Sequence, residues 1–227
     1  MVRELFNSIA EHYDLVNRLT TLGIDRHWRK KACEEALRYI TQERIRILDI
    51  ACGTGDMIRC MKKRLEKRGL SAEFHGLDCS ERMLEIARKK VPFAELKVGT
   101  AEEIPFSDES IDLVSVAFGL RNFSDRERAM GEMHRVLKEN GVLLLLEFSR
   151  NNSPPGRFAW FYTKSIVPLV GSLLTGNRKA YDHLWRSIRA FPSPEELSLE
   201  FKKKGFTVLS SKWLFPRIAF VMVLRKV

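Results

Sequence analysis

The sequence has few of the features that mark secreted, membrane-spanning or metal-binding proteins. Only four of its 227 residues are cysteines, and their spacing matches neither redox nor zinc motifs: Cys33, Cys52, Cys60 and Cys79. We interpret them as reduced, core-filling thiols of a cytoplasmic protein. No apolar stretch reaches the ~18 residues that a spanning helix needs. The first residues mix charges, so we expect no signal peptide.

Two common phosphate-binding motifs are also missing. The chain contains neither the P-loop pattern G-x4-G-K-[ST] nor the dinucleotide fingerprint G-x-G-x-x-G. Its five histidines show no metal-ligand spacing, so we expect no metal site. A nucleoside-containing ligand would have to be held by something other than these motifs.

What the chain has in excess is positive charge. It carries 39 Lys and Arg residues against 29 Asp and Glu residues, a formal net charge of +10. This balance favours a polyanionic neighbour, which is either nucleic acid or an anionic membrane surface. Charge alone does not choose between the two.

The chain is organised around residues 45–56. Residues 45–50 are a short apolar run with β-branched side chains, which predicts a buried parallel strand. Gly53, Thr54 and Gly55 then turn the chain, and Asp56 is expected to cap the next helix. A strand, a glycine turn and a helix N-terminus together predict a ligand cradle. A tight turn without a ligand is the structural alternative.

Acidic residues narrow the choice of ligand. Asp49 and Asp56 flank the turn, where two carboxylates would repel a pyrophosphate and suit a cationic ligand with an amino group. Asp78 ends a second strand, at a location where nucleotide-binding sheets use an acid to accept hydrogen bonds from ribose hydroxyls. Thr100 and Ala101 follow the third strand, and this turn is expected to lie beside an adenine ring.

Predicted strands alternate with helices through most of the chain, which predicts an α/β fold with a doubly wound, seven-stranded, mostly parallel sheet. The predicted strands are residues 45–50, 72–78, 94–98, 111–116, 142–148, 206–215 and 218–225. Expected helix caps are Ser80, Ser124 and either Ser193 or Pro194. We expect a single domain over residues 1–227, divided into a helical lid (1–41), a cofactor-binding core (42–149), a helical insertion (150–192) and a closing helix with strands (193–227).

The insertion has an apolar and aromatic stretch at residues 157–175. Its apolar residues are Phe158, Trp160, Phe161, Tyr162, Ile166, Val167, Leu169, Val170, Leu173 and Leu174. They are expected either to pack as an ordinary helix or to form a wall for an apolar substrate that also touches a membrane.

Several longer motifs point to one family. D-x-A-x-G-T-G-D at residues 49–56 marks a superfamily, whereas F-G-L-R-N at 118–122 and L-E-F-S at 146–149 are more specific. Further matches are Y-D-L-V-N at 13–17, G-I-D-R-H-W-R at 23–29, I-P-F at 104–106 and S-I-R-A-F-P at 187–192. With these motifs the chain resembles the ubiquinone/menaquinone biosynthesis C-methyltransferases, which are class I S-adenosylmethionine-dependent methyltransferases.

The resemblance implies methyl transfer from S-adenosylmethionine to a ring carbon of a prenylated hydroquinone. It implies cofactor contacts at Asp49, Gly53, Thr54, Gly55, Asp78, Thr100 and Ala101. A further family position, often serine, is Ala117 here, so any side-chain hydrogen bond at that position is lost. Cys52 stands where the family often has a glycine, which slightly alters how closely the cofactor can approach.

Methylation of an aromatic carbon requires an electron-rich ring, and a phenol with a pKa of ~10 must be ionised to supply it. Arg121 is the candidate that stabilises the phenolate, because arginine stays charged. Asn122 is expected to hold the same oxygen, and Tyr13 to orient the ring or a water from the lid. The structural alternatives are an ion pair of Arg121 with Asp125 or Glu147, and simple packing of Tyr13.

Three competing functions follow from the same residues. The first is a methyltransferase for another small molecule, such as a sterol or phenol. The second is an RNA methyltransferase, although the insertion is apolar where a nucleic-acid surface would be basic and aromatic. The third is a non-catalytic cofactor-binding regulator. We expect a prenylated quinol substrate, no nucleic acid, peripheral contact with an anionic membrane, and a homodimer. The residues leave open whether the ring is a naphthoquinol or a benzoquinol.

Overall fold

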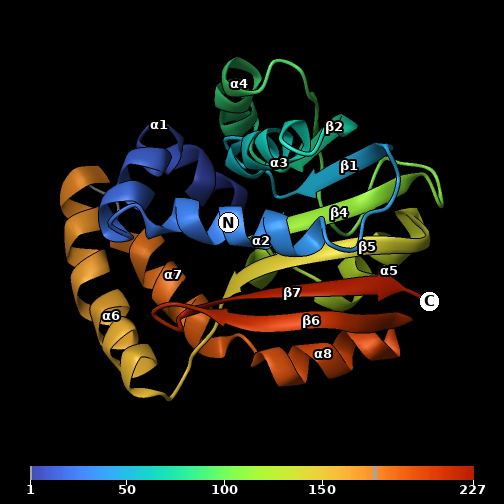
Figure 1. Ribbon diagram of the computed structural model, residues 1–227. Helices are drawn as coiled ribbons and strands as arrows, with labels where there is room; N and C mark the ends of the chain where they lie inside the picture. Colours follow the sequence, from blue (N-terminus) through green and yellow to red (C-terminus); the bar gives the residue numbers. More distant parts are fainter. Residues whose placement is uncertain (1, 176–177) are drawn as a thin grey trace.

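The computed structural model describes residues 2–175 and 178–227, and the side chains of residues 2 and 169–181 lie outside this description. A seven-stranded sheet with the order β3-β2-β1-β4-β5-β7-β6 runs through the molecule (Figure 1). Its strands are β1 (Arg44–Ile50), β2 (Ser71–Asp78), β3 (Glu95–Val98), β4 (Ile111–Ala117), β5 (Leu137–Phe148), β6 (Phe206–Leu214) and β7 (Ala219–Lys226). The first five strands are parallel, and β7 is antiparallel to both β5 and β6. The predicted sheet is therefore confirmed, including its antiparallel end.

The sheet is covered on both faces, because the side chains of its central strands alternate between two apolar cores. Ile45 and Ile47 of β1 belong to one core, and Leu48 and Ile50 belong to the other. Helices α2 (Ile24–Ala36) and α3 (Asp56–Glu66), with part of α4 (Glu81–Lys90), complete the first core. Helices α5 (Arg126–Val136) and α8 (Pro194–Lys203) complete the second.

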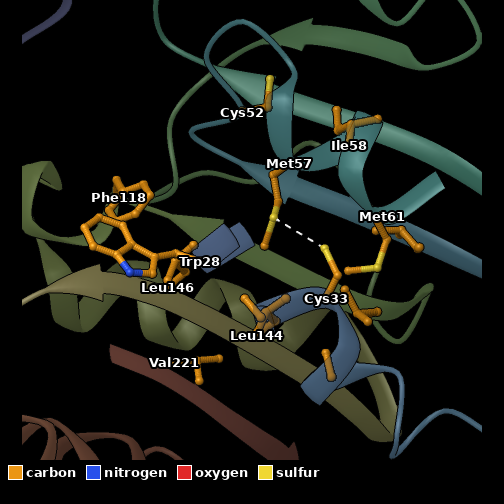
Figure 2. Packing of buried hydrophobic residues seen from close by; sticks show 14 of the residues in the cluster. Trp28, Cys33, Cys52, Met57, Ile58, Met61, Phe118, Leu144, Leu146 and Val221 are labelled. Carbon is orange, nitrogen blue, oxygen red and sulfur yellow. Dashed lines mark hydrogen bonds between the residues drawn. The ribbon is translucent and has the colours of Figure 1, made fainter. Parts of the chain in front are cut away.

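Part of the first core reaches the carboxyl ends of β4 and β5. Trp28 of α2 packs edge-on against Phe148, whose ring stacks on that of Phe118 with 4.5 Å between centroids. Farther along α2, Cys33 lies 3.8 Å from the sulfur of Met57 (Figure 2). The cysteines are unbridged, as expected for core-filling thiols.

A second helical layer lies beyond the carboxyl ends of the parallel strands. It contains α1 (Val2–Thr20), α6 (Pro154–Thr175) and α7 (Arg178–Ala190), which group at one end of the sheet (Figure 1). Ile9 and Val16 of α1 share a buried cluster with Val167 of α6. Four residues of the predicted apolar wall fall outside the described side chains: Leu169, Val170, Leu173 and Leu174. Within the described parts of the chain, no helix is long and apolar enough to cross a membrane.

Local predictions were correct where a side chain determines a helix start and wrong where neighbouring residues compete. Ser80 caps α4, and Ser193 caps α8 in a capping box with Glu196. Ser124 was expected to cap α5, but the cap is Asp125, whose carboxylate accepts the N–H of Arg128. An aspartate one residue later can reach the same first-turn donors.

Two further expectations need correction. Asp56 does not cap α3: the capping position is Gly55, which offers no side chain, and Asp56 is the first helical residue. The fifth strand begins at Leu137 rather than Val142, because Leu137 already pairs with Ile111, before a register shift after which Val142 pairs with Leu113.

Candidate functional site

The glycine turn after β1 leaves open space at one glycine and packs tightly at the other. Gly53 and Gly55 have φ values of +53° and +82°, in the left-handed region that favours glycine. A Cβ on Gly55 would lie 2.8 Å from Cγ2 of Val91, whereas a Cβ on Gly53 would meet no atom within 4 Å. Gly55 is therefore required by packing, and the space at Gly53 is available to a ligand.

Asp78, the acid predicted at the end of the second strand, holds the geometry of the turn. Asp78 accepts the N–H of Gly53 at 2.8 Å and that of Ser80 at 2.9 Å. Burial raises the pKa of Asp78, and these backbone donors oppose the rise. Asp78 thus ties the end of β2 to the turn after β1.

Asp49 is 2% exposed and keeps one oxygen without a protein partner. Its Oδ1 accepts the hydroxyl of Ser115, the residue opposite it on β4, at 2.6 Å. Its Oδ2 is buried and has no hydrogen-bond partner among the described residues. Burial raises the pKa of Asp49 to about 7. Because a buried unpaired oxygen is costly, this atom is suited to receive a donor from a ligand.

A small cavity of about 110 Å³ lies over the turn. Five of the predicted cofactor positions line it: Gly53, Asp78, Thr100, Ala101 and Ala117. The other three predicted positions, Asp49, Thr54 and Gly55, do not. Sequence reasoning missed Cys79, Met83, Glu102 and Phe123 in the same wall. Cys79, Glu102 and Phe123 directly follow the predicted residues Asp78, Ala101 and Asn122, so their positions in the chain were the available signal.

A larger cavity of about 820 Å³ adjoins it between the sheet and the helical layer. Most of its wall is apolar, with side chains from α1, α2, α6 and α7. The three predicted catalytic residues, Tyr13, Arg121 and Asn122, all line it. The two cavities share four wall residues, Phe6, Tyr13, Phe118 and Asn122. The site therefore has room for two ligands that meet at this shared wall.

Arg121 forms the buried ion pair that was its structural alternative. Its guanidinium lies 2.6 Å from Oε1 of Glu147, and the two side chains are 7% and 1% exposed. Asp125, the other partner considered, instead caps α5. The Nε of Arg121 is buried and donates to no described residue. Arg121 therefore retains one unused donor while Glu147 balances its charge.

His183 is a functional candidate that the sequence did not reveal. It belongs to α7, lines the larger cavity, and places Nε2 3.0 Å from Oδ1 of Asn122. Burial lowers its pKa, and the positive charge of Arg121 lowers it further. Tyr13, on the opposite wall, has a pKa raised by burial. No motif distinguishes this histidine, since only folding brings α7 to Asn122.

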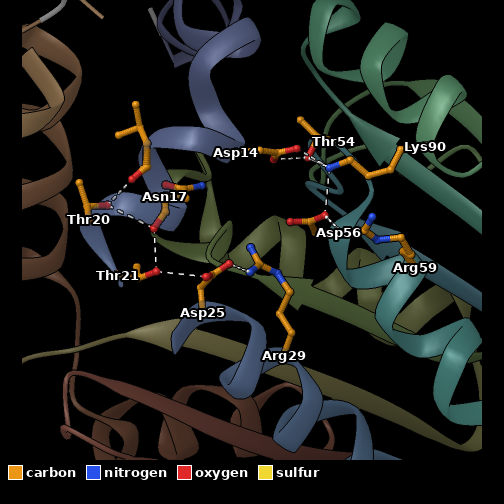
Figure 3. Close-up of polar contacts among 11 residues, drawn as sticks. Asp14, Asn17, Thr20, Thr21, Asp25, Arg29, Thr54, Asp56, Arg59 and Lys90 are labelled. Carbon is orange, nitrogen blue, oxygen red and sulfur yellow. Dashed lines mark hydrogen bonds and ion pairs between the residues drawn. The ribbon is translucent and has the colours of Figure 1, made fainter. Parts of the chain in front are cut away.

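A polar network ties helix α1 to the glycine turn (Figure 3). Lys90 donates to the hydroxyl of Thr54 at 2.8 Å, to Asp56 at 2.9 Å, and to Asp14 of α1. The Thr54 hydroxyl donates to Asp14 at 2.7 Å. Burial raises the pKa of Asp56, but the charges of Lys90 and Arg29 outweigh it and leave that pKa below its usual value. The side chain of Thr54 therefore fastens α1, rather than facing either cavity.

No group of three or more His, Cys, Asp or Glu side chains in the described ranges is arranged to hold a metal ion. The fold is that of S-adenosylmethionine-dependent methyltransferases. A solved structure of such an enzyme from Thermotoga maritima matches with a TM-score of 0.64 at 24% identity, over 97% of this chain and 99% of that one. Another, from Aquifex aeolicus, matches with a TM-score of 0.59 at 17% identity, over 86% of this chain and 89% of that one.

The sequence profile of the ubiE/COQ5 methyltransferase family matches residues 1–218, and the chain belongs to this family. The Thermotoga maritima protein named demethylmenaquinone methyltransferase is 41% identical over 221 residues, covering 96% of this chain and 93% of that protein. A Campylobacter jejuni protein named ubiquinone/menaquinone biosynthesis C-methyltransferase UbiE is 37% identical over 230 residues, covering 98% and 96%. The predicted family, and with it the methyltransferase activity, is confirmed.

The network at Lys90 generates a test of how α1 is held. Lys90→Gln removes the cation between Asp14 and Asp56, which are then two neighbouring carboxylates. A hydrogen bond to a charged group contributes about 1.5–3 kcal/mol, so we expect amide hydrogen exchange in α1 to accelerate by about tenfold. The matched control is Lys89→Gln at the exposed neighbouring position. Equal exchange rates in the two variants would show that the network does not hold α1.

Proposed function

We propose that this enzyme transfers a methyl group from S-adenosylmethionine to a ring carbon of a prenylated hydroquinone. The observation that carries the proposal is the pair of adjoining cavities, one small and lined with acids, the other large and apolar. A prenylated ring needs an apolar chamber with a few polar groups at one end. Two of the four residues at the shared wall, Tyr13 and Asn122, carry hydrogen-bonding side chains.

The residues of the smaller site fit the cofactor. S-adenosylmethionine supplies an electrophilic methyl group on a sulfonium centre. Asp78, in the cavity wall, suits the ribose hydroxyls. The unpaired Oδ2 of Asp49, which is outside that wall, is proposed to receive the amino group of the cofactor. Thr100 and Ala101 supply the wall proposed for adenine. Ala117 contributes only backbone and a methyl group, so no side-chain hydrogen bond is proposed there.

Three residues are proposed to act on the acceptor ring. Arg121 lines the larger cavity, and its guanidinium can hydrogen-bond a phenolate oxygen, which favours the ionised and therefore nucleophilic ring. Because Glu147 neutralises much of the Arg121 charge, this directed hydrogen bond carries more of the effect than long-range attraction. Asn122 and Tyr13 then fix the ring at the shared wall, so that the reacting carbon faces the smaller cavity.

The named relatives suggest the acceptor ring. One is named for demethylmenaquinone, and the other for both ubiquinone and menaquinone biosynthesis. We propose demethylmenaquinol as the substrate and menaquinol as the product, with the benzoquinol of ubiquinone synthesis as the second candidate. Another small phenolic acceptor would use the same cofactor site.

The test supplies methyl-labelled S-adenosylmethionine with a reduced short-chain demethylmenaquinol, a benzoquinol analogue or bulk tRNA. We expect label on a ring carbon of the naphthoquinol, located by mass spectrometry. Label on the benzoquinol alone would change the substrate within the same reaction. Label on tRNA alone would overturn the proposal and make the +10 charge a nucleic-acid footprint.

The role of Arg121 is tested without leaving a buried carboxylate unpaired. Arg121→Ala alone is expected to lose most turnover, but it would strand Glu147, which costs about 3–5 kcal/mol. The double variant Arg121→Gln, Glu147→Gln removes both charges. We expect it to bind the cofactor within about threefold of wild type and to lose about 10²–10³-fold in kcat. Glu147→Gln alone, which keeps the guanidinium, is the control. Near-normal turnover of the double variant would remove Arg121 from the mechanism.

We also propose that the enzyme works on the cytoplasmic face of a membrane and contacts its anionic surface. Three exposed apolar side chains line the larger cavity and mark its opening: Leu22 (85% exposed), Phe158 (73%) and Phe215 (73%). Exposed apolar groups at a cavity mouth suit contact with the lipid in which a prenylated quinol resides, and the +10 charge suits anionic headgroups. The expected homodimer stays a prediction.

Vesicle sedimentation tests this contact. The variant Leu22→Ser, Phe215→Ser should bind anionic vesicles about tenfold or more weakly than wild type, because two apolar contacts are lost. Leu199→Ser removes an exposed apolar residue that lies outside the cavity wall and serves as the control. High salt should weaken wild-type binding. Equal wild-type binding to neutral vesicles would argue against an electrostatic contribution.

A further inference from the structure

We propose that His183 accepts the proton that the acceptor ring loses after methyl transfer. This inference rests on the proposed function and adds a group that the sequence motifs do not contain. Three structural arguments support it: the position of His183, the tautomer that Asn122 imposes, and the other ionisable groups around the same cavity.

The position of His183 brings it to the shared wall of the two cavities. It lines the larger cavity and hydrogen-bonds Asn122, which borders both. A ring held by Asn122 therefore lies within the chamber that His183 also faces. The segment 120–122 that carries Asn122 packs against α7, so the pairing is part of the folded framework.

The hydrogen bond to Asn122 determines which nitrogen of His183 is basic. Oδ1 of an asparagine side chain is only an acceptor, so Nε2, at 3.0 Å, must carry the hydrogen. In the neutral ring the lone pair is then on Nδ1. After Nδ1 takes a proton, Nε2 still donates to Asn122, which stabilises the imidazolium.

The charged and titratable groups facing the cavity leave His183 as its available base. Arg29 and Arg121 are cations, and Asp25 is paired with Arg29 and accepts the hydroxyl of Thr21. Tyr13 has a pKa raised by burial, so it holds its proton at neutral pH. The remaining titratable side chain of the cavity wall, Tyr162 of α6, is a phenol.

The surroundings of His183 keep it neutral before the reaction. Burial and the charge of Arg121 both lower its pKa, so at neutral pH the ring is ready to accept a proton. On its own helix Asp182 and Arg186 flank it in sequence, and on α6 the ammonium of Lys164 lies over the ring of Trp185, 5.9 Å from its centroid. A pKa below the ordinary histidine value suits a base that operates at neutral pH.

The step balances without a further reactant. The ring carbon bonds to the methyl carbon while the methyl–sulfur bond breaks and its electron pair stays on sulfur. That ring carbon then carries both a hydrogen and a methyl group. Nδ1 of His183 takes the hydrogen as a proton, and the C–H electron pair restores the aromatic ring. Release of the proton to water returns His183 to its neutral form.

The test compares His183→Gln with wild type, using a demethylmenaquinol deuterated at the reacting carbon. Glutamine can still donate to Asn122 but is not a base. We expect kcat to fall by about 10²–10³-fold, with affinity for S-adenosylhomocysteine unchanged. We also expect a deuterium isotope effect larger than that of wild type, because proton removal becomes rate-limiting. His27→Gln, at an exposed position outside the cavity, is the control.

A second variant protects the test from a folding defect. His183→Ala leaves space for added imidazole, which should restore turnover in proportion to its concentration if the ring acts as a base. A kcat within threefold of wild type, with an unchanged isotope effect, would overturn the role of His183 while wild-type methylation stands. No rescue of a folded His183→Ala variant would also overturn it. If wild type itself fails to methylate the quinol, the proposed function fails first and this inference with it.

Discussion

The left-handed turn at the end of β1 is the constraint on which the rest of the site depends. Val91, the residue that follows α4, fills the space where a Cβ of Gly55 would lie, so only glycine lets β1 pass into α3 along this path. That path exposes the backbone of Gly53 to the smaller cavity and sets its N–H against Asp78. It also places Thr54 and Asp56 beside Lys90, through which α1 is fastened. Cofactor cradle and helical cover are thus fixed by one turn.

The ion pair of Arg121 and Glu147 is a structural contact made by the residue that is proposed to act on the acceptor ring. A buried arginine without a carboxylate would be costly, and so would a buried glutamate without a cation. Paired, the two groups fix the guanidinium at the ends of β4 and β5, and Nε of Arg121 has no hydrogen-bond partner among the described residues. Asn122 also makes more than one contact. Its amide oxygen is hydrogen-bonded to His183, and Asn122 borders both cavities. Such dual use keeps the number of polar groups in an apolar chamber small.

The strands of the sheet were predictable from sequence because short apolar runs depend on local spacing. The detailed partners were not. Asp56 was expected to cap the helix, but its carboxylate accepts a hydrogen bond from Lys90 of the next helix. Thr54 was expected to contact the cofactor, and in the structure its hydroxyl donates a hydrogen bond to Asp14, forty residues away. His183 belongs to no motif, and it became a candidate only because the fold places it in contact with Asn122, sixty-one positions earlier. Partners that are far apart in the chain are brought together by tertiary packing, and local sequence patterns do not reveal them.

The two cavities open at different kinds of surface. Thr100 and Ser124 are exposed and polar at the smaller cavity, whereas Leu22, Phe158 and Phe215 are exposed and apolar at the larger one. In the proposed reaction the methyl donor is hydrophilic and the acceptor dissolves in hydrocarbon. The polarity of each cavity opening therefore matches the polarity of the reactant proposed to enter there. Under the proposed function, the protein would act as a catalytic junction between two phases. Neither reactant would leave the medium in which it is concentrated until it reached the wall formed by Tyr13 and Asn122.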